Sequence, residues 1–470
     1  MVRCCVKFDA MTQPKNTNAN IVARSLASVW HPCTQMKHHE QFPLVPIQRG
    51  EGAWLIDHEG KRYLDAVSSW WVNLFGHANP RINAALKNQL DQLEHAMLAG
   101  FTHEPAIELS EQLSRLTGLG HAFYGSDGAS AVEIALKMSF HYWRNVGKPE
   151  KKKFVSLESS YHGETLGALS VTDVAIFRDA YGPLLNNNLL VPFPGGMAGK
   201  SMGAGILGRH ASNSSLDGHL EACCPECTVD ASAALERLFI ERAGEIAAFI
   251  IEPLVQGAAG MRMYHPAYLQ KARELCTQYG VHLIADEIMT GFGRTGTLFA
   301  CEQANIKPDF MCLSKGITGG YLPLSCVLTT DEVYAAFYHD DTARGFLHSH
   351  SYTGSALACR AALATLDIFS SNDVIEKNRA KAQRWMALCQ PLATHQRVKN
   401  FRRSGMIFAF EVESQHPKFA REFFALALQR GALLRPIGNT VYFMPPYIVD
   451  DDEFQWLATQ TIDVIEAMQK

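Results

Sequence analysis

The sequence predicts an α/β protein with a large, mostly parallel sheet that helices cover on both faces. Segments with helical and strand patterns alternate through the middle of the chain, in the order helix 131–144, strand 154–157, helix 233–243, strand 247–252, helix 266–279 and strand 282–286. Strands separated by helices pair in parallel through crossover connections. The strands are continuous apolar runs, which is typical of a sheet buried on both faces.

The segments before and after this core predict further elements. Residues 53–64 have the pattern of two short strands joined at 57–60, which indicates a hairpin. Apolar residues recur at helical spacing over 80–98 and 105–116, and each segment has a proline early, where its missing N–H costs nothing. A further apolar run covers residues 308–313.

The last part of the chain differs from the core. After about residue 340 we expect helices and shorter strands, ending in helices over 421–429 and 451–468, which suits a separate C-terminal subdomain. Residues 195–228 have no periodic apolar pattern and are rich in Gly, Ser, Asn, His and Cys. We therefore expect an insertion loop there.

Composition excludes several classes of protein. The chain has 470 residues, of which 47% are hydrophobic and 19% charged, so it can bury a large core. Its net charge of −4 is scattered, so we expect no nucleic-acid partner. No apolar run reaches the roughly 18 residues that a membrane span needs, so we expect no membrane association.

The chain start and the cysteines indicate the compartment. Residues 1–10 lack the apolar stretch and cleavage site of a signal peptide, and Met11 is an alternative start. Most of the twelve cysteines are isolated in apolar segments, as in reduced cytoplasmic proteins. Cys223, Cys224 and Cys227, with histidines upstream at 210 and 219, could instead bind zinc, but we predict no metal site.

Two opposite charges are expected at one edge of the sheet. The strand 282–286 ends in Asp286, and the apolar run 308–313 leads to Lys315; ligands of parallel sheets bind at this carboxyl edge. A structural ion pair is the simpler interpretation for an Asp and a Lys taken alone. Glycines at 291–296 and 316–320 favour a bound cofactor instead, because they let the backbone approach it closely.

At this point the sequence resembles the class III aminotransferases, which use pyridoxal 5'-phosphate (PLP) and have fold type I. Their signature is an apolar strand ending in Asp-Glu, then Gly-Phe-Gly-Arg-Thr-Gly, then a lysine about thirty residues after the acid; here Lys315 follows Asp286 by 29 residues. The resemblance covers roughly residues 28–465. It implies a large PLP-binding domain and a small α+β domain formed by both chain ends. We predict the boundaries as a disordered tail 1–20, small-domain segments 21–80 and 346–470, and a large domain 81–345.

Further motifs resemble one branch of this class, the 7,8-diaminononanoate synthase family of biotin biosynthesis. They are Trp-His-Pro at 30–32, Ser-Ser-Trp-Trp at 68–71, Tyr-His-Gly at 161–163, Arg435-Pro436 and Met-Pro-Pro-Tyr at 444–447. That family transfers an amino group from S-adenosylmethionine to 8-amino-7-oxononanoate. We expect the same reaction here.

The resemblance implies cofactor roles for several residues. Lys315 would hold PLP covalently and then move the proton, and Asp286 would keep the ring nitrogen protonated, with Ile288 on the same side of the strand. Gly128 and Ala129 occupy the family's phosphate positions at a helix start, with Ser130 as a substitute for a missing hydroxyl. A plain capped helix start is the alternative.

Other residues are expected at the substrate or at the subunit interface. Tyr161 would stack on the cofactor ring or reach the substrate, unless it is an ordinary core tyrosine. In the segment 348–354, His350 and Ser351 would contact the phosphate of the neighbouring subunit and Ser349 the substrate. An obligate homodimer is therefore implied.

The keto substrate has a nine-carbon chain and a carboxylate, so it requires an apolar wall and a cation. Trp70 and Arg435 fit these roles, because an arginine fork holds a carboxylate with two hydrogen bonds. Core packing for Trp70 and a surface ion pair for Arg435 are the alternatives.

Two positions depart from the family. Cys33 replaces a tyrosine and Glu164 an aspartate, both at positions associated with the donor or substrate, so lysine is an alternative amino donor.

Three other functions remain open at this stage. A different ω-aminotransferase acting on ornithine, 4-aminobutyrate or a diamine would not need the Trp pair or Arg435. An isomerase of the same fold would move the amine within one molecule. A PLP-binding regulator would need a DNA-binding module, for which the chain has no room.

Overall fold

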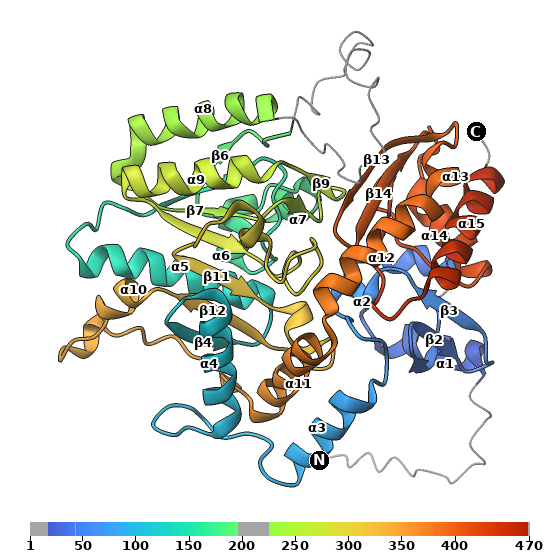
Figure 1. Ribbon diagram of the computed structural model, residues 1–470, viewed down its shortest axis with the longest axis horizontal. Helices are drawn as coiled ribbons and strands as arrows, with labels where there is room; N and C mark the ends of the chain where they lie inside the picture. Colours follow the sequence, from blue (N-terminus) through green and yellow to red (C-terminus); the bar gives the residue numbers. More distant parts are fainter. Residues whose placement is uncertain (1–16, 43, 196–224, 469–470) are drawn as a thin grey trace, which may run out of the picture.

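The computed structural model describes residues 17–42, 44–195 and 225–468 (Figure 1). Its centre is a seven-stranded sheet with the strand order β4-β12-β11-β10-β7-β5-β6. The strands are β4 (His121–Gly125), β5 (Lys153–Leu157), β6 (Leu189–Val191), β7 (Ile246–Ile251), β10 (His282–Asp286), β11 (Phe310–Leu313) and β12 (Ser325–Thr329).

The sheet is mostly parallel, as predicted. β6, β5, β7, β10 and β11 pair in parallel, and only β12 runs antiparallel, to both β11 and β4. In the register of β10 and β11, Asp286 is opposite Cys312, so the chain after each strand emerges at the same edge. This edge is where Asp286 and Lys315 were expected to meet.

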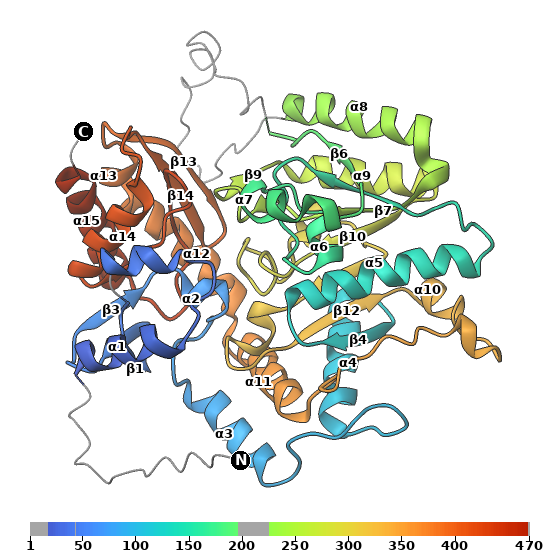
Figure 2. The same ribbon diagram turned by 180° about the vertical axis from the view of Figure 1, so that it is seen from behind.

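Both faces of the sheet are buried, because alternate residues of each strand enter different apolar clusters. Along β10, Leu283 and Ala285 belong to one cluster and Ile284 to the other. Helix α5 (Gly128–Asn145), which lies across the sheet in Figure 2, contributes more residues to the cluster of Ile284 than any other element. The opposite cluster includes α8 (Pro225–Arg242) and α9 (Pro266–Tyr279). The predicted doubly covered α/β sheet is thereby confirmed.

Helix boundaries agree with the predictions in part. α9 has the predicted bounds, and α4 (Glu104–Thr117) is within a residue of them. α3 (Pro80–Leu90) is shorter than the predicted helix to residue 98. The buried Gln89 explains this, because its side-chain amide donates to the carbonyl of Leu93 and holds the chain in a turn. The apolar spacing beyond residue 90 therefore does not continue the helix.

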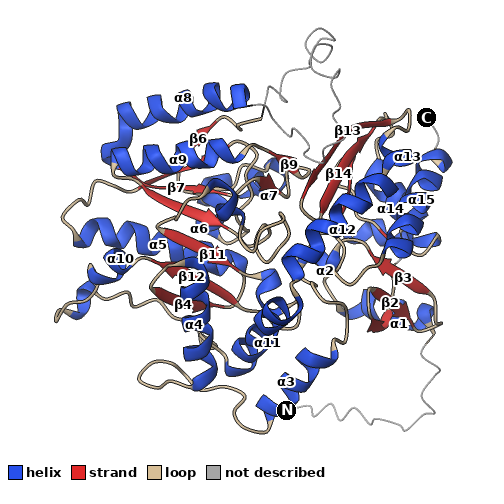
Figure 3. Cartoon of the chain, in the orientation of Figure 1, coloured by secondary structure: helices blue, strands red, loops and turns tan. Residues whose placement is uncertain are grey.

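The small region is built from both ends of the chain. β2 (Trp54–Asp57) and β3 (Arg62–Asp65) form the predicted hairpin, β1 (Ile47–Glu51) pairs with β2, and β15 (Ala432–Leu433) pairs in parallel with β3. A second, antiparallel sheet has the order β13-β14-β16 and lies beside the C-terminal helices in Figure 3. Its strands are β13 (Val398–Ser404), β14 (Ile407–Val412) and β16 (Thr440–Phe443). The small α+β region from both chain ends is thus confirmed.

The remaining long helices pack against other helices, both beside the large sheet and in the small region. α11 (Ala356–Asn372) packs against α3 and α4, whereas α12 (Val374–Leu388) and α14 (Phe419–Gln429) pack against α15 (Asp451–Ala467). The shorter elements are α1 (Asn18–Ser28), η1 (Met36–Glu40), α2 (Ser68–Trp71), α6 (Leu166–Ser170), α7 (Ala175–Arg178), η2 (Asp179–Leu184), η3 (Ala243–Glu245), β8 (Val255–Gln256), β9 (Arg262–Met263), η4 (Ala300–Ala304), η5 (Lys315–Thr318), α10 (Asp331–Ala335), η6 (Thr342–Arg344) and α13 (Gln390–Ala393).

Two predicted irregular segments are only partly described. Residues 1–16 of the predicted tail lie outside the described residues, but helix α1 already begins at Asn18, whose side-chain amide donates to Asp57. Most of the predicted insertion at 195–228 also lies outside them, including Cys223, Cys224 and the histidines at 210 and 219. α8 nevertheless begins at Pro225, earlier than the helix predicted from residue 233.

None of the helices among the described residues is both long enough and apolar enough to cross a membrane.

Candidate active site

The carboxyl ends of four neighbouring strands bring the predicted chemistry together. Asp286 ends β10, Lys315 follows β11, Glu252 follows β7, and Tyr161 and His162 come shortly after β5. The two opposite charges predicted from the sequence therefore lie at one edge of the sheet. Glu252 and His162 had no predicted role, although His162 stands inside the quoted Tyr-His-Gly motif.

Asp286 is buried and held in one orientation. Its Oδ2 atom lies 2.7 Å from Nδ1 of His162, and its Oδ1 atom accepts a hydrogen bond from the N–H of Ile288 at 3.2 Å. His162 is buried as well, and its Nε2 atom has no hydrogen-bond partner among the described residues. The imidazole of His162 thus fixes the orientation of the Asp286 carboxylate. The sequence analysis gave this positioning residue no role.

Glu252 is a second buried carboxyl group in the site. It accepts hydrogen bonds from the backbone N–H of Gly257 at 3.0 Å and of Tyr161 at 3.1 Å. Burial raises the pKa of Glu252 to about 7; His162 opposes this rise, and the nearby Asp286 adds to it. Glu252 therefore changes charge near neutral pH, and its hydrogen bond fixes the backbone at Tyr161.

Lys315 is half-buried and has a left-handed backbone, with φ of 47°. Its Nζ atom lies 4.5 Å from the ring centroid of Trp71. Desolvation lowers the pKa of Lys315 to about 8; Asp286 and Glu252 oppose the shift, and Arg294 adds to it. Among the described residues, none accepts a hydrogen bond from this amine. A lysine with these properties supplies a substantial fraction of neutral, nucleophilic amine near pH 7 to 8.

The start of α5 offers free backbone donors. Asp127 caps the helix by accepting hydrogen bonds from both the N–H and the hydroxyl of Ser130, each at 3.0 Å. The N–H groups of Gly128 and Ala129 have no acceptor among the described residues. Ser130 was expected to substitute for a phosphate-binding hydroxyl, but the structure commits that hydroxyl to Asp127. The expectation for Ser130 is therefore not supported.

The residues at this edge fit PLP. The two free N–H groups at a helix start suit a phosphate, the oriented Asp286 suits a ring nitrogen, and the amine of Lys315 suits an aldehyde. Close packing leaves space only for backbone at Gly128, where an added Cβ would lie 3.0 Å from Ile288. Ile288 thus lies next to the phosphate positions, on the same strand end as Asp286. No three acidic, histidine or cysteine side chains within the described ranges are grouped to hold a metal ion.

Tyr161 lies beside the two positions that depart from the family. Its hydroxyl donates to Glu164 at 2.9 Å, and its ring centroid lies 5.3 Å from that of Phe177. Burial raises the pKa of Tyr161, with Glu164, Cys33 and Asp286 adding to the shift. Cys33 and Glu164 are both exposed. The structure therefore brings Cys33 and Glu164 together around this tyrosine, as the sequence suggested.

Ser68 to Trp71 form a left-handed turn, with φ between 46° and 73° at all four residues. Such a conformation costs about 1–2 kcal/mol per non-glycine residue, so tertiary contacts must hold it. Ser68 donates to the carbonyl of Met444 at 2.7 Å, and Ser69 donates to the buried Asp65 through both its N–H and its hydroxyl. The turn fixes the directions of the two tryptophans.

Arg294 is fully buried and also supports this turn. Its guanidinium donates to the carbonyl oxygens of Trp71, Asn73 and Pro445 at 2.9–3.2 Å. The arginine comes from the Gly-Phe-Gly-Arg-Thr-Gly motif, in which sequence reasoning gave roles only to the glycines.

Trp70 and Arg435 are brought together, as predicted. The Arg435 guanidinium lies 4.5 Å from the Trp70 ring centroid, and both side chains are exposed. Within the described part of the chain, Arg435 makes no ion pair. Neither alternative, a core tryptophan or a surface ion pair, therefore fits, and the cation remains available for an anion.

Ser349, His350 and Ser351 lie apart from Lys315. His350 contacts His348 at 3.0 Å, His348 contacts Lys137, and the carbonyl of Ser351 faces His95. None of the described contacts joins these residues to Asp286 or Lys315. A role for them in this chain's own site therefore receives no support, and the expected role in a neighbouring subunit stays a prediction.

Comparisons with known proteins agree with this geometry. The family model described as Aminotransferase class-III matches residues 34–465. The adenosylmethionine-8-amino-7-oxononanoate aminotransferase of Helicobacter pylori is 46% identical over 97% of this chain and 100% of its own length. The protein of the same name from Geobacter sulfurreducens is 40% identical over 91% of this chain and 93% of its own.

Solved structures give the same result. The adenosylmethionine-8-amino-7-oxononanoate aminotransferase of Methanocaldococcus jannaschii superposes with a TM-score of 0.86 at 34% identity, over 96% of this chain and 99% of that chain. A PLP-bound amine transaminase from an uncultivated Pseudomonas species superposes with a TM-score of 0.83 at 29% identity, over 93% and 98%.

Proposed function

Because the chain belongs to the class III aminotransferases, we propose that it transfers an amino group from S-adenosylmethionine to 8-amino-7-oxononanoate, in biotin biosynthesis. It is an aminotransferase, and enzymes of its class use PLP. The observation that favours this substrate within the class is the exposed Arg435 guanidinium, which lies against Trp70 without an ion-pair partner among the described residues. Trp70 supplies an apolar wall for the carbon chain, and Arg435 binds the carboxylate.

The residues of the sheet edge divide the work of holding the cofactor. The N–H groups of Gly128 and Ala129 would bind the phosphate, Ile288 and Tyr161 would pack against the ring, and Asp286 would hold the ring nitrogen. His162 orients Asp286. When bound, PLP supplies an aldehyde that bonds to amines and a ring that withdraws electrons from the substrate carbon.

Lys315 would hold the cofactor through its amine, and when that amine is free it would carry the proton at its Nζ atom. A pKa of about 8 suits this role, because the group can both take up and release a proton near neutral pH. Tyr161, its hydrogen-bond partner Glu164 and the nearby Cys33 form the side of the site that receives the amino donor. The reaction proceeds as two half-reactions, so its kinetics are ping-pong.

The enzyme acts as a homodimer in the cytoplasm. Four large apolar side chains from two segments, 97–101 and 347–352, are exposed in the single chain: Met97, Phe101, Leu347 and Tyr352. The second segment contacts the chain just before the first, because the ring centroids of Tyr352 and His95 lie 5.0 Å apart. A second copy covering this surface would place Ser349, His350 and Ser351 at the partner's site, and sedimentation at micromolar concentration measures the dimer directly.

The substrates are tested with purified enzyme, PLP and 8-amino-7-oxononanoate, with S-adenosylmethionine or lysine as donor and mass spectrometry of the diamine. Product with S-adenosylmethionine is the expected result, and no product with either donor would contradict the proposed acceptor. Arg435→Ala should raise KM for the keto acid about 10- to 100-fold, as expected for the loss of a charge-assisted hydrogen-bond pair. Arg430→Ala is the matched control, because Arg430 lies just before β15 and Arg435 just after it.

Lysine as donor is the alternative that a specific observation favours. Cys33 removes the ring and hydroxyl of the family's tyrosine, and the longer Glu164 reaches the Tyr161 hydroxyl at 2.9 Å. Product with lysine alone would establish this alternative. The double substitution Cys33→Tyr with Glu164→Asp should then shift the preference back toward S-adenosylmethionine.

A further inference from the structure

Trp71 presents the face of its indole ring directly to the amine of Lys315. The Nζ atom lies 4.5 Å from the ring centroid, within the range of a cation–π interaction. Unlike Trp70, whose side chain is 45% exposed, Trp71 is 6% exposed. The two tryptophans are neighbours in sequence but have different surroundings, so their roles differ.

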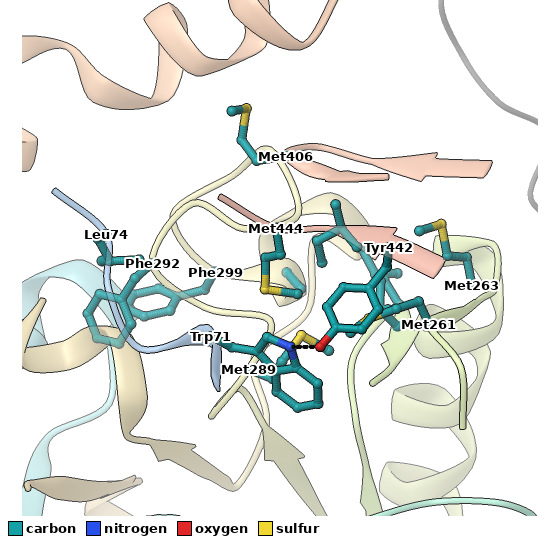
Figure 4. Packing of buried hydrophobic residues seen from close by; sticks show 14 of the residues in the cluster. Trp71, Leu74, Met261, Met263, Met289, Phe292, Phe299, Met406, Tyr442 and Met444 are labelled. Carbon is teal, nitrogen blue, oxygen red and sulfur yellow. Dashed lines mark hydrogen bonds between the residues drawn. The ribbon is translucent and has the colours of Figure 1, made fainter. Parts of the chain in front are cut away.

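The position of the Trp71 ring is fixed from several sides. Its Nε1 atom donates to the hydroxyl of Tyr442 at 3.0 Å, a bond drawn in Figure 4. Gly257 makes room for the ring edge, since an added Cβ there would lie 3.2 Å from the indole and 3.0 Å from Met289. Arg294 donates to the Trp71 carbonyl and so fixes its backbone. The ring cannot move away from the lysine without breaking these contacts.

The charged groups that face Lys315 come from three neighbouring elements. Asp286 at the end of β10 and Glu252 after β7 favour the ammonium form, whereas Arg294 from the glycine-rich loop disfavours it. None of them forms an ion pair or hydrogen bond with the amine among the described contacts. Within the described residues, the indole face of Trp71 is therefore the one group placed directly against the amine that stabilises a positive charge there.

We propose that Trp71 is a positioning residue whose indole face stabilises the ammonium form of Lys315 once the free amine has taken up a proton. The inference rests on the proposed role of Lys315. The ammonium form is the one that can return a proton to the substrate. Trp71 therefore stabilises Lys315 in the state that precedes this proton transfer. It also keeps Nζ at the sheet edge, from which the bond to the cofactor re-forms.

The test measures the protonation of Lys315 without turnover. Full-length protein is loaded with pyridoxamine phosphate, which leaves the lysine unbonded, and is labelled with trace acetic anhydride from pH 6 to 10. Mass spectrometry gives the labelling of Lys315 at each pH. Trp71→Leu should lower the apparent pKa of Lys315 by about half a unit to one and a half units, and Trp71→Phe by less, because phenylalanine keeps an aromatic face. An unchanged profile in Trp71→Leu would overturn the proposal.

Milder variants keep the test decisive if Trp71→Leu folds poorly. Tyr442→Phe removes only the hydrogen bond to the indole, and Gly257→Ala pushes the ring away; both should shift the Lys315 profile in the same direction. Lys151 is an internal control, because its Nζ lies 4.7 Å from the ring of a different tryptophan, Trp143. Trp143 lies on α5, whereas Trp71 lies on α2. The Lys151 profile should stay unchanged in the Trp71 variants and move in Trp143→Leu.

The labelling result is independent of the proposed function. If Lys315 is not the cofactor lysine, Lys315→Met will retain the covalently bound cofactor's absorbance whatever the labelling shows. If Trp71 has only a packing role, all variants will lower thermal stability while the Lys315 profile stays in place.

Discussion

Lys151 and Lys315 are two buried or half-buried lysines with similar surroundings at first sight. Each has its amine close to a tryptophan ring, at 4.7 Å from Trp143 and 4.5 Å from Trp71. Desolvation lowers the pKa of each to about 8. By these criteria alone, both would be candidates for chemistry.

Their partners separate them. Lys151 donates to the carbonyl oxygens of Ala243 and Ile246, at 2.6 and 3.0 Å, and so joins the start of η3 to the start of β7. Lys315 has no such acceptor among the described residues and instead faces the carboxyl groups of Asp286 and Glu252. A lowered pKa therefore does not identify a reactive lysine; an amine without an acceptor, at the carboxyl edge of a parallel sheet, does.

The largest effect should come from replacing the reactive lysine. Lys315→Met removes the amine that holds the cofactor and moves the proton, so kcat should fall by on the order of 10⁴-fold and the bound cofactor's absorbance should change to that of a noncovalent complex. Steady-state assays and absorbance spectra measure both. Retained colour and turnover would show that Lys315 is not the reactive lysine.

A smaller loss should follow Asp286→Asn. A neutral amide cannot hold a proton on the ring nitrogen, and it also removes an anionic neighbour of Lys315, so kcat should fall by on the order of 10²–10³-fold. Asp309→Asn is the matched control, because Asp309 pairs with Arg273 at the other end of the neighbouring strand. Equal losses in the two variants would indicate a structural effect only.

Glu252→Gln should alter the pH dependence more than the rate. The pKa of Glu252 is about 7 against an ordinary 4.5, so lowering the pH from 8 to 6 adds a proton and removes an anion that faces Lys315. The wild-type kcat should therefore fall over this range. The variant should lack that fall and lose less than about tenfold at pH 8.

The same shift has a consequence for stability. Folding raises the pKa of Glu252. Its contribution to the free energy of unfolding is therefore stabilising below pH 4.5 and is lost as the pH rises through 7. Wild type should thus lose stability relative to Glu252→Gln between about pH 5 and 8, as measured by thermal melts. Parallel melting curves at all pH values would contradict the assignment.

The smallest effect on activity is expected for Lys151→Met. The methionine keeps the apolar stem but removes the ammonium donor of two hydrogen bonds, to the carbonyl oxygens of Ala243 and Ile246, which costs about 1–3 kcal/mol. The melting temperature should drop by a few degrees while kcat stays within about twofold of wild type. A large loss of kcat would remove the distinction between the two lysines.

Much of the site could be predicted because its signals are local in sequence. Asp286 ends an apolar strand, the glycine-rich turn follows it, and Lys315 follows the next strand, so the order of elements places both at one edge. The helix start at Gly128 was visible in the same way. These predictions need only the alternation of helices and strands.

The remainder depends on contacts between distant segments. The contact of His162 with Asp286 spans 124 residues and that of Trp71 with Tyr442 spans 371, so no local pattern indicates them. The left-handed turn at Ser68 to Trp71 contradicts the preferences of its own residues and depends on Arg294 and Met444. Likewise the shorter α3 follows from the tertiary role of Gln89.

The pairing of β3 with β15 has a consequence for how the protein is made. Leu64 pairs with Ala432, so the first strand leaves the ribosome long before its partner. At about 5–20 residues per second, this interval is roughly 20–70 s. During that time the hairpin has an unpaired edge, and Arg435 and Tyr442 are not yet synthesised. The large sheet can form as the chain emerges, but the substrate pocket is completed only after almost all of the chain has been translated.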